Sequence, residues 1–304
     1  MKKRSSRREF LKNSAEALGA LACSCGSAQT AEPAKPAAQS SGSLAGRVHK
    51  AVQLRMLPKN LSYPERFKLA RDAGFEYVEG YMVTDPAEAT EIKKAADTAG
   101  VRIHGVTNGL WEKWPLSSPD ASVVRKRLET VRRSLRQSRL YGGTTALVVP
   151  GLVTPTVSYS EAWVQSHKSL SSVLSFAAAQ REIIAVEEVW NKFLLSPLEF
   201  ACYVDQFKSP WLKAYFDVGN VMPYGYPQEW IRTLGKRIAK IHLKDYDPKT
   251  HKIVNLGEGT VDWHAVRQAL LDIRCDGIVT VELAPGPEPY LRDVSERVDK
   301  LVLY

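Results

Sequence analysis

Cysteine is scarce in this sequence, with four among 304 residues, which excludes a small scaffold held together by disulfides. Beyond residue 45 no segment approaches the run of about 18 apolar residues that a membrane-spanning helix requires, so we expect nothing to span a membrane. Basic residues outnumber acidic ones by nine, but they form no stripe. Residues 1–45 carry +4 of this charge and the remainder carries +5. We therefore expect no nucleic-acid partner.

The rest of the composition is typical of a folded protein. Hydrophobic residues make up 44% of the chain and charged residues 25%, with seven tryptophans and twelve tyrosines. This composition argues against a disordered chain, and the length allows one large domain or two small ones.

The first 45 residues differ in character from the rest of the chain. After a basic start, residues 6–12 read SRREFLK, which is similar to the twin-arginine export motif, with Arg7 and Arg8 as its arginine pair. A short, weakly apolar stretch comes next at 15–22, and then a linker rich in Ala, Pro, Ser and Gln. We expect residues 1–45 to be an export signal and disordered linker. Its partner would be the twin-arginine translocase, and the location periplasmic or otherwise exported. A disordered basic tail is the alternative.

Residues 46–304 repeat a pattern of a short apolar or β-branched run followed by a helical one. The predicted strands lie at 51–57, 77–82, 101–107, 145–149, 183–187, 214–217, 239–243 and 278–283. The predicted helices lie near 64–73, 86–99, 121–141, 160–179, 197–207, 227–234, 263–273 and 292–303. Eight such units predict a (β/α)8 TIM barrel with its active site at the carboxyl ends of the strands. A doubly wound open sheet is less favoured, because no Gly-rich phosphate fingerprint follows the first strand.

The last four predicted strands each end on a residue that can bind a metal. Glu187, Asp217, His242 and Glu282 are separated by 30, 25 and 40 residues, each about one strand–helix unit. Their side chains should therefore converge on one side of the barrel mouth. Three carboxylates and an imidazole favour Mn²⁺ or Mg²⁺, and Co²⁺ or Zn²⁺ could also occupy the site.

Several segments of this chain resemble the xylose isomerase-like barrel family. They are EEVWNKF at 187–193, YFDVGN at 215–220, IHLKD at 241–245, GEGTVDW at 257–263 and VEL at 281–283. Within the family they are most similar to sugar phosphate isomerases/epimerases of the ketose 3-epimerase and L-xylulose-5-phosphate 3-epimerase type. The resemblance spans about residues 50–304.

The resemblance implies a sugar substrate, one divalent ion held by the four strand-end residues, and often a homodimer. It also implies that Glu187 and Glu282 move a proton beside a ketose carbonyl through an enediolate. An aldose–ketose isomerisation would use the same parts. Glu188 remains an alternative ligand to Glu187, because some relatives have the ligand one residue nearer the Asn. Some ketose epimerases have a substrate-binding His where this chain has Asn220.

A second group of residues could contact the sugar. Lys244 should face the same way as His242 by strand alternation, and a salt bridge with Asp245 or Glu258 is its alternative role. Trp111 and Trp114 come after the third strand, where aromatic rings could stack on a sugar face. We predict the substrate-binding residues to be Lys244, Glu258, His104, Trp114, Trp190 and Asn220, with Glu79 as a further substrate or supporting residue.

Three other functions can be weighed against a sugar isomerase or epimerase. A related barrel cleaves abasic DNA with three zinc ions, but this chemistry needs more strand-end histidines than the six scattered here provide. Dehydration of an inosose-type cyclic sugar uses a very similar ligand set and stays open. A non-catalytic exported sugar-binding barrel also stays open, and an exported enzyme would more plausibly meet free sugars than sugar phosphates.

Overall fold

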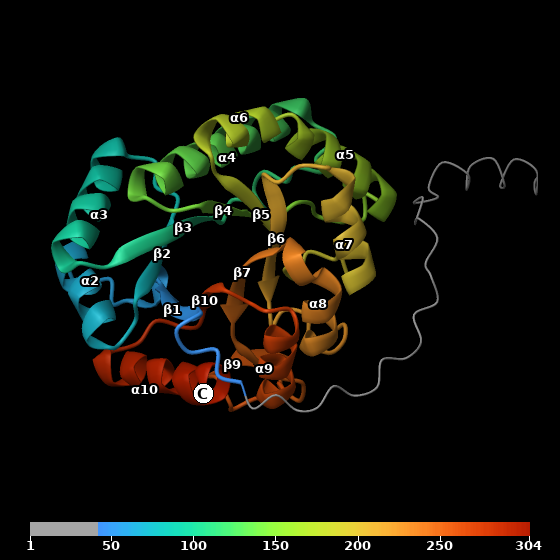
Figure 1. The fold of residues 1–304 in the computed structure, drawn as a ribbon. Helices are drawn as coiled ribbons and strands as arrows, with labels where there is room; N and C mark the ends of the chain where they lie inside the picture. The colour runs from blue at the N-terminus through green and yellow to red at the C-terminus, as the bar shows by residue number, and fades with distance from the viewer. Residues whose placement is uncertain (1–41) are drawn as a thin grey trace, which may run out of the picture. The chain divides into compact units, whose positions relative to one another are not determined.

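The computed structural model describes residues 42–304, so the predicted export signal and nearly all of the linker lie outside the described residues. In this part of the chain, eight parallel strands close into a barrel, in the order β1-β10-β7-β6-β5-β4-β3-β2. Figure 1 shows the helices as a ring around these strands. The predicted TIM barrel is confirmed. The strands are β1 (Val48–Gln53), β2 (Tyr77–Tyr81), β3 (Arg102–Asn108), β4 (Thr145–Val148), β5 (Ile183–Glu187), β6 (Leu212–Asp217), β7 (Ile238–Leu243) and β10 (Gly277–Val281).

The main helices begin close to the predicted positions because their caps are encoded locally. Asp85, Asp120, Ser158, Ser196 and Asp262 each accept a backbone N–H from the first turn of the adjoining helix. Asp262 is therefore an N-cap residue. The helices are α2 (Tyr63–Asp72), α3 (Pro86–Ala99), α4 (Ala121–Tyr141), α5 (Tyr159–Ser171), α6 (Leu174–Gln180), α7 (Pro197–Gln206), α8 (Pro227–Leu234), α9 (Trp263–Asp272) and α10 (Glu288–Val298).

Besides the first strand, which ends at Gln53 and not at residue 57, three local features differ from the sequence prediction. The helix expected at 160–179 is interrupted between α5 and α6, where two serines and Val173 form a weak helical stretch. The last helix begins earlier, at Glu288, and continues into a π-helical turn at Asp299–Leu303. Between β7 and α9 the chain forms an antiparallel hairpin of β8 (Asp245–Asp247) and β9 (Lys252–Val254). These strands are too short to show an alternating pattern.

The barrel interior is unusually polar. Apolar side chains fill the space between strands and helices, but Glu79, Tyr215 and His242 are buried inside the barrel. His104 is also buried there, with Nε2 2.9 Å from Oγ1 of Thr280. Since parallel barrels usually fill this space with branched apolar residues, a buried polar cluster marks the site. Across residues 42–304, no helix is long and apolar enough to cross a bilayer.

Candidate metal centre

The four predicted ligands meet at one side of the barrel mouth. Glu187 and Asp217 are the last residues of β5 and β6, His242 lies one residue before the end of β7, and Glu282 directly follows β10. One ligand atom from each side chain lies within 4.8 Å of all the others. The strands β5, β6, β7 and β10 are consecutive neighbours in the barrel, so equal positions along them are adjacent in space.

The imidazole of His242 stands at the centre of the group. Its Nδ1 lies 2.9 Å from Oε1 of Glu187, 3.2 Å from Oε2 of Glu282 and 3.7 Å from Oδ2 of Asp217. The other ring nitrogen, Nε2, lies 2.8 Å from Oε2 of Glu79. One nitrogen thus faces the three carboxylates, and the other faces a fourth carboxylate deeper in the barrel.

The backbone around Asp217 aims this carboxylate at the centre. Its Oδ1 accepts the backbone N–H groups of Gly219 (2.8 Å) and Asn220 (2.9 Å). The other oxygen, Oδ2, remains for Lys244, whose Nζ lies 2.9 Å away. Glycine is required at 219 because a Cβ there would collide with the Lys244 side chain. This is the physical reason for Gly in the DVGN segment.

The candidate centre carries more negative charge than the neighbouring cationic side chains neutralise. Lys244 contacts Oε2 of Glu282 at 2.5 Å as well as Asp217; Lys244 and Asp217 are buried, and Glu282 is partly exposed. Burial, together with the carboxylates of Glu282 and Asp217 and against the opposing effect of His242, raises the pKa of Glu187 to about 8. Burial alone would lower the pKa of His242, but the surrounding carboxylates together raise it well above its usual value. A divalent cation would relieve this excess, and three carboxylate oxygens with one imidazole nitrogen suit such an ion.

Glu188, the alternative ligand, lies outside the four-residue group. It is buried, both of its carboxylate oxygens lack a hydrogen-bond partner, and burial together with Asp217 and Glu187 raises its pKa to about 10. Its backbone carbonyl instead accepts the side-chain N–H of Asn220 at 3.1 Å. The structure thus brings Glu187, and not Glu188, into the candidate centre.

A cavity of about 430 Å³ is lined by two of the four candidate ligands, Glu187 and Glu282, and by several predicted substrate residues. Lys244, Trp190 and Asn220 are among them, together with Trp111. The indole N–H of Trp190 donates to the backbone carbonyl of Asn220 at 3.1 Å, which fixes the ring at the cavity wall. Ile253, from the β8–β9 hairpin, reaches the same cavity, so the unpredicted hairpin helps to cover it.

Three predicted substrate residues lie elsewhere within residues 42–304. His104 faces Thr280 inside the barrel, below the ligands. Trp114 packs against Lys113, whose Nζ lies 5.0 Å from the ring centroid, while Trp111 takes the place at the cavity. Glu258 forms an ion pair with Arg297 at 3.1 Å and is half-exposed. Which of two nearby tryptophans faces a cavity depends on the path of an irregular loop, which sequence alone does not define.

Sequence reasoning also missed residues that belong to the centre. The side-chain amide of Gln53 donates to Oε1 of Glu282 at 2.8 Å, and the hydroxyl of Tyr215 donates to Oε1 of Glu79 at 2.7 Å. Gln53 is the last residue of β1, so the rule that selected the four ligands could have found it. Because the predicted first strand extends to residue 57, Gln53 does not stand at the end of a predicted strand.

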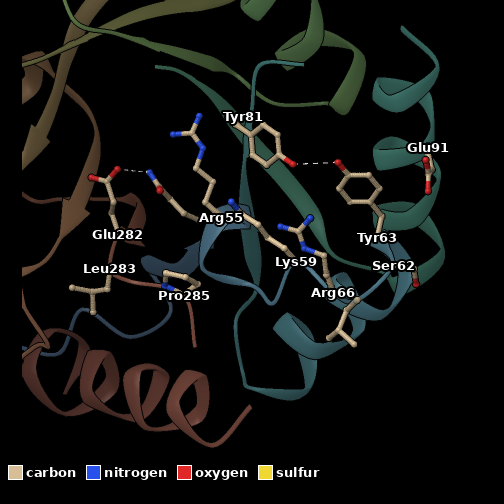
Figure 2. A pocket seen from close by; sticks show the side chains of 12 residues that line it. Arg55, Lys59, Ser62, Tyr63, Arg66, Tyr81, Glu91, Glu282, Leu283 and Pro285 are labelled. Carbon is tan, nitrogen blue, oxygen red and sulfur yellow. Dashed lines mark hydrogen bonds between the residues drawn. The ribbon is translucent and has the colours of Figure 1, made fainter. Parts of the chain in front are cut away.

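Arg55 was missed as well, and it joins two cavities. It lines the cavity over the ligands and a neighbouring one of about 810 Å³, and Glu282 also borders both. Lys59 and Arg66 also line this second cavity, and Figure 2 shows the Arg55 guanidinium beside the ring of Tyr81. The guanidinium of Arg55 lies 5.3 Å from the ring centroid of Tyr81.

Comparison with known proteins agrees with this geometry. Residues 67–300 match the family model described as xylose isomerase-like TIM barrel. The chain belongs to this family. Among its relatives, SgbU of Escherichia coli K12, a provisionally named L-ribulose-5-phosphate 3-epimerase, is 28% identical over 80% of this chain and 92% of its own length. The L-ribulose-5-phosphate 3-epimerase UlaE of the same strain is 24% identical over 75% of this chain and 84% of its own.

Solved structures of this xylose isomerase-like fold superpose well on the barrel. A D-allulose 3-epimerase from Methylomonas sp. gives a TM-score of 0.72 at 19% identity, covering 84% of this chain and 96% of the other. The named relatives are sugar epimerases, which are isomerases, as the resemblance in the sequence predicted.

Proposed function

We propose that this protein is a divalent-metal-dependent isomerase that epimerises a sugar at the carbon beside its ketone. The observation that carries the proposal is the convergence of Glu187, Asp217, His242 and Glu282, with ligand atoms within 4.8 Å of one another under a cavity. The epimerase names of the relatives support the same class of reaction.

Epimerisation requires that a proton leave one face of a carbon and that another arrive at the opposite face. Glu187 and Glu282 come from β5 and from the end of β10, the outer two of the four neighbouring strands, so they flank the centre with Asp217 and His242 between them. One glutamate accepts the proton from the carbon, which leaves an enediolate, and the other returns a proton from the far side. When bound, a divalent ion supplies Lewis acidity at the ketone oxygen.

The remaining residues of the centre orient these two groups. Lys244 holds Oε2 of Glu282, and Gln53 holds Oε1 of the same carboxylate. Trp190 and Trp111 line the cavity and would exclude water from the reacting carbon while offering an apolar ring to the sugar.

The part of the substrate beyond the reacting carbon would extend into the second cavity, past Arg55. Three cationic side chains and the sugar-phosphate names of relatives support a phosphorylated ketose. The predicted export signal supports a free sugar instead, because sugar phosphates are not expected outside the cytoplasm. We also propose, from the SRREFLK motif alone, that the chain is exported by the twin-arginine translocase.

The test measures bound metal and proton exchange on the same purified protein. Metal is quantified by mass spectrometry, and deuterium uptake from solvent into free and phosphorylated ketoses and aldoses is followed by NMR. Glu282→Gln should abolish the exchange, and Glu229→Gln on the exposed face of α8 is the control that should not.

We expect about one divalent ion per chain and exchange at a single carbon. Loss of water from the substrate would replace the proposal with an inosose-type dehydratase. A protein that binds a sugar without metal and without exchange would leave a non-catalytic sugar-binding barrel.

A further inference from the structure

The carboxylate of Glu79 lies below the metal-binding group, on the side of His242 away from the cavity. It is 1% exposed, and its Oε2 lies 2.8 Å from Nε2 of that histidine. If Nδ1 of the imidazole binds a metal, the single proton of the neutral ring must sit on Nε2. Glu79 is placed to accept that proton in a hydrogen bond, so it selects the tautomer in which Nδ1 is free to bind.

Two further side chains prevent the Glu79 carboxylate from turning away. The hydroxyl of Tyr215 donates to Oε1 at 2.7 Å, and the amide of Gln53 donates to Oε2 at 3.1 Å. The ring of Tyr215 also packs on the imidazole of His242, with centroids 4.3 Å apart. These side chains are buried, so no solvent competes for the hydrogen bonds.

The same amide of Gln53 connects Glu79 to Glu282, one of the two proposed proton-transfer residues. Its nitrogen carries two hydrogens, and it donates to Oε2 of Glu79 and to Oε1 of Glu282 at 2.8 Å. The orientation of Glu282 is therefore set together with that of the imidazole, through one side chain at the end of β1.

We infer that Glu79, Tyr215 and Gln53 are positioning residues that hold the ring of His242 with Nδ1 facing the metal site, keep the proton on Nε2 when Nδ1 binds, and set the direction of Glu282. The inference rests on the proposed function only in assuming that the centre takes a divalent ion. Carboxylate partners of metal-binding histidines typically contribute 10- to 100-fold to metal affinity. Glu79→Gln should accordingly weaken metal binding by about this factor.

The experiment measures Zn²⁺ dissociation constants by competition with a chelating dye, for the full protein and its variants. Glu79→Gln removes the charged acceptor at nearly constant volume, and Tyr215→Phe removes one hydroxyl and keeps the ring. Glu182→Gln and Tyr203→Phe are matched controls. Glu182 is a fully buried glutamate outside the centre, and the hydroxyl of Tyr203 pairs with Ser166 at 2.8 Å.

A spectroscopic readout separates positioning from general loss of packing. In ¹¹³Cd-substituted protein labelled with ¹⁵N-histidine, the one-bond coupling identifies which nitrogen of His242 binds the metal. We expect coupling to Nδ1 in the wild type and its loss, or its division between the two nitrogens, in Glu79→Gln. Tyr215→Phe should weaken Zn²⁺ binding in the same direction by a smaller factor. The two controls should leave both the affinity and the coupling unchanged.

Unchanged affinity and an unchanged Nδ1 coupling in a folded Glu79→Gln protein would overturn the inference. If that variant does not fold, an unchanged affinity in Tyr215→Phe would do so instead. A wild-type protein that binds Zn²⁺ but exchanges no substrate proton, even when loaded with Mn²⁺, would refute the proposed function. The ratio of the Zn²⁺ dissociation constants of variant and wild type would still decide this inference. A wild-type protein that binds no divalent ion would refute both.

Discussion

Replacing Lys244 with methionine would remove the one lysine within residues 42–304 that pairs with the candidate ligand carboxylates. Its Nζ lies 2.9 Å from Asp217 and 2.5 Å from Glu282, and its side chain is 9% exposed. Methionine keeps much of the side-chain volume but leaves these carboxylates facing Glu187 without the lysine charge, with His242 as their remaining partner. The metal-free protein should therefore be destabilised far more than by the loss of a surface ion pair.

The size of the effect follows from burial. Removing one member of a buried ion pair costs about 3–5 kcal/mol, whereas an exposed pair contributes about 0–1 kcal/mol. The Asp217 side chain is fully buried and that of Glu282 is 30% exposed, which places the expected loss toward the lower end of that range. Since each kcal/mol shifts the melting temperature of a domain of this size by about 2–4 °C, we expect a decrease of about 6–12 °C in chelator.

Metal should restore much of this loss. A metal ion whose free concentration is a thousand times its dissociation constant stabilises the folded state by about 4 kcal/mol. Its two positive charges would also replace the single charge lost with Lys244. The gain in melting temperature on adding metal should thus be larger in Lys244→Met than in wild type, provided both are saturated.

The pH dependence has a definite sign. In the wild type, burial alone would raise the pKa of Glu282, but His242 and Lys244 hold it well below its usual value. This carboxylate therefore stabilises the fold above its unfolded pKa of about 4.3, and the contribution is lost as pH falls through the lower folded value. Without Lys244 the pKa of Glu282 rises, so the variant should gain stability relative to wild type as pH falls from 8 to 6.

The assay is a thermal melt followed by circular dichroism, with chelator or with Mn²⁺, at pH 6 and pH 8. Lys252→Met, at an exposed position of β9, is the matched control. A melting temperature for Lys244→Met within about 2 °C of wild type in chelator at pH 8 would refute the argument that this lysine neutralises buried charge.

Three further predictions concern the pH dependence of metal binding, the second cavity and the export signal. Burial, together with Glu282 and Asp217, raises the pKa of Glu187 to about 8. The protonated carboxyl of Glu187 is therefore favoured in the folded, metal-free protein, and its contribution to stability should be lost as pH rises from about 4.3 through about 8. Metal affinity measured by calorimetry should increase over the same range, and a flat profile would contradict this. Arg55→Met should raise KM by about tenfold or more with little change in kcat, because the residue lines the route beyond the reacting carbon; an unchanged KM would remove Arg55 from the substrate path. Replacing both Arg7 and Arg8 with lysine should retain the full-length protein in the cytoplasm, as measured by cell fractionation, and unimpeded export would exclude the twin-arginine route.

Local chemistry made most of the barrel predictable. The helices at Pro86–Ala99, Ala121–Tyr141 and Pro227–Leu234 have the predicted bounds. For the first two, an N-cap aspartate and a left-handed C-cap glycine lie next to the helix itself. Elements without such local markers were displaced or missed, as the division between α5 and α6 and the β8–β9 hairpin show.

The four ligands could be found in the sequence because they are dictated by topology. A parallel barrel brings the carboxyl ends of neighbouring strands together, so Glu187, Asp217, His242 and Glu282 had to converge once the strands were known. Of Glu187 and Glu188, Glu187 directly follows the apolar run of its strand, and neighbouring residues of a strand face opposite sides of the sheet. The structure places only the first of these two in the group.

The sequence by itself thus determined the barrel and the four strand-end residues that converge as candidate metal ligands, because each depends on periodicity, caps or position along a strand. Only the tertiary structure decided that Gln53 joins Glu79 to Glu282, that Trp111 and not Trp114 faces the cavity, and that Arg55 connects two cavities. These contacts join residues far apart in the chain or on irregular loops. Their partners are selected by barrel closure and side-chain packing, which no local pattern in the sequence records.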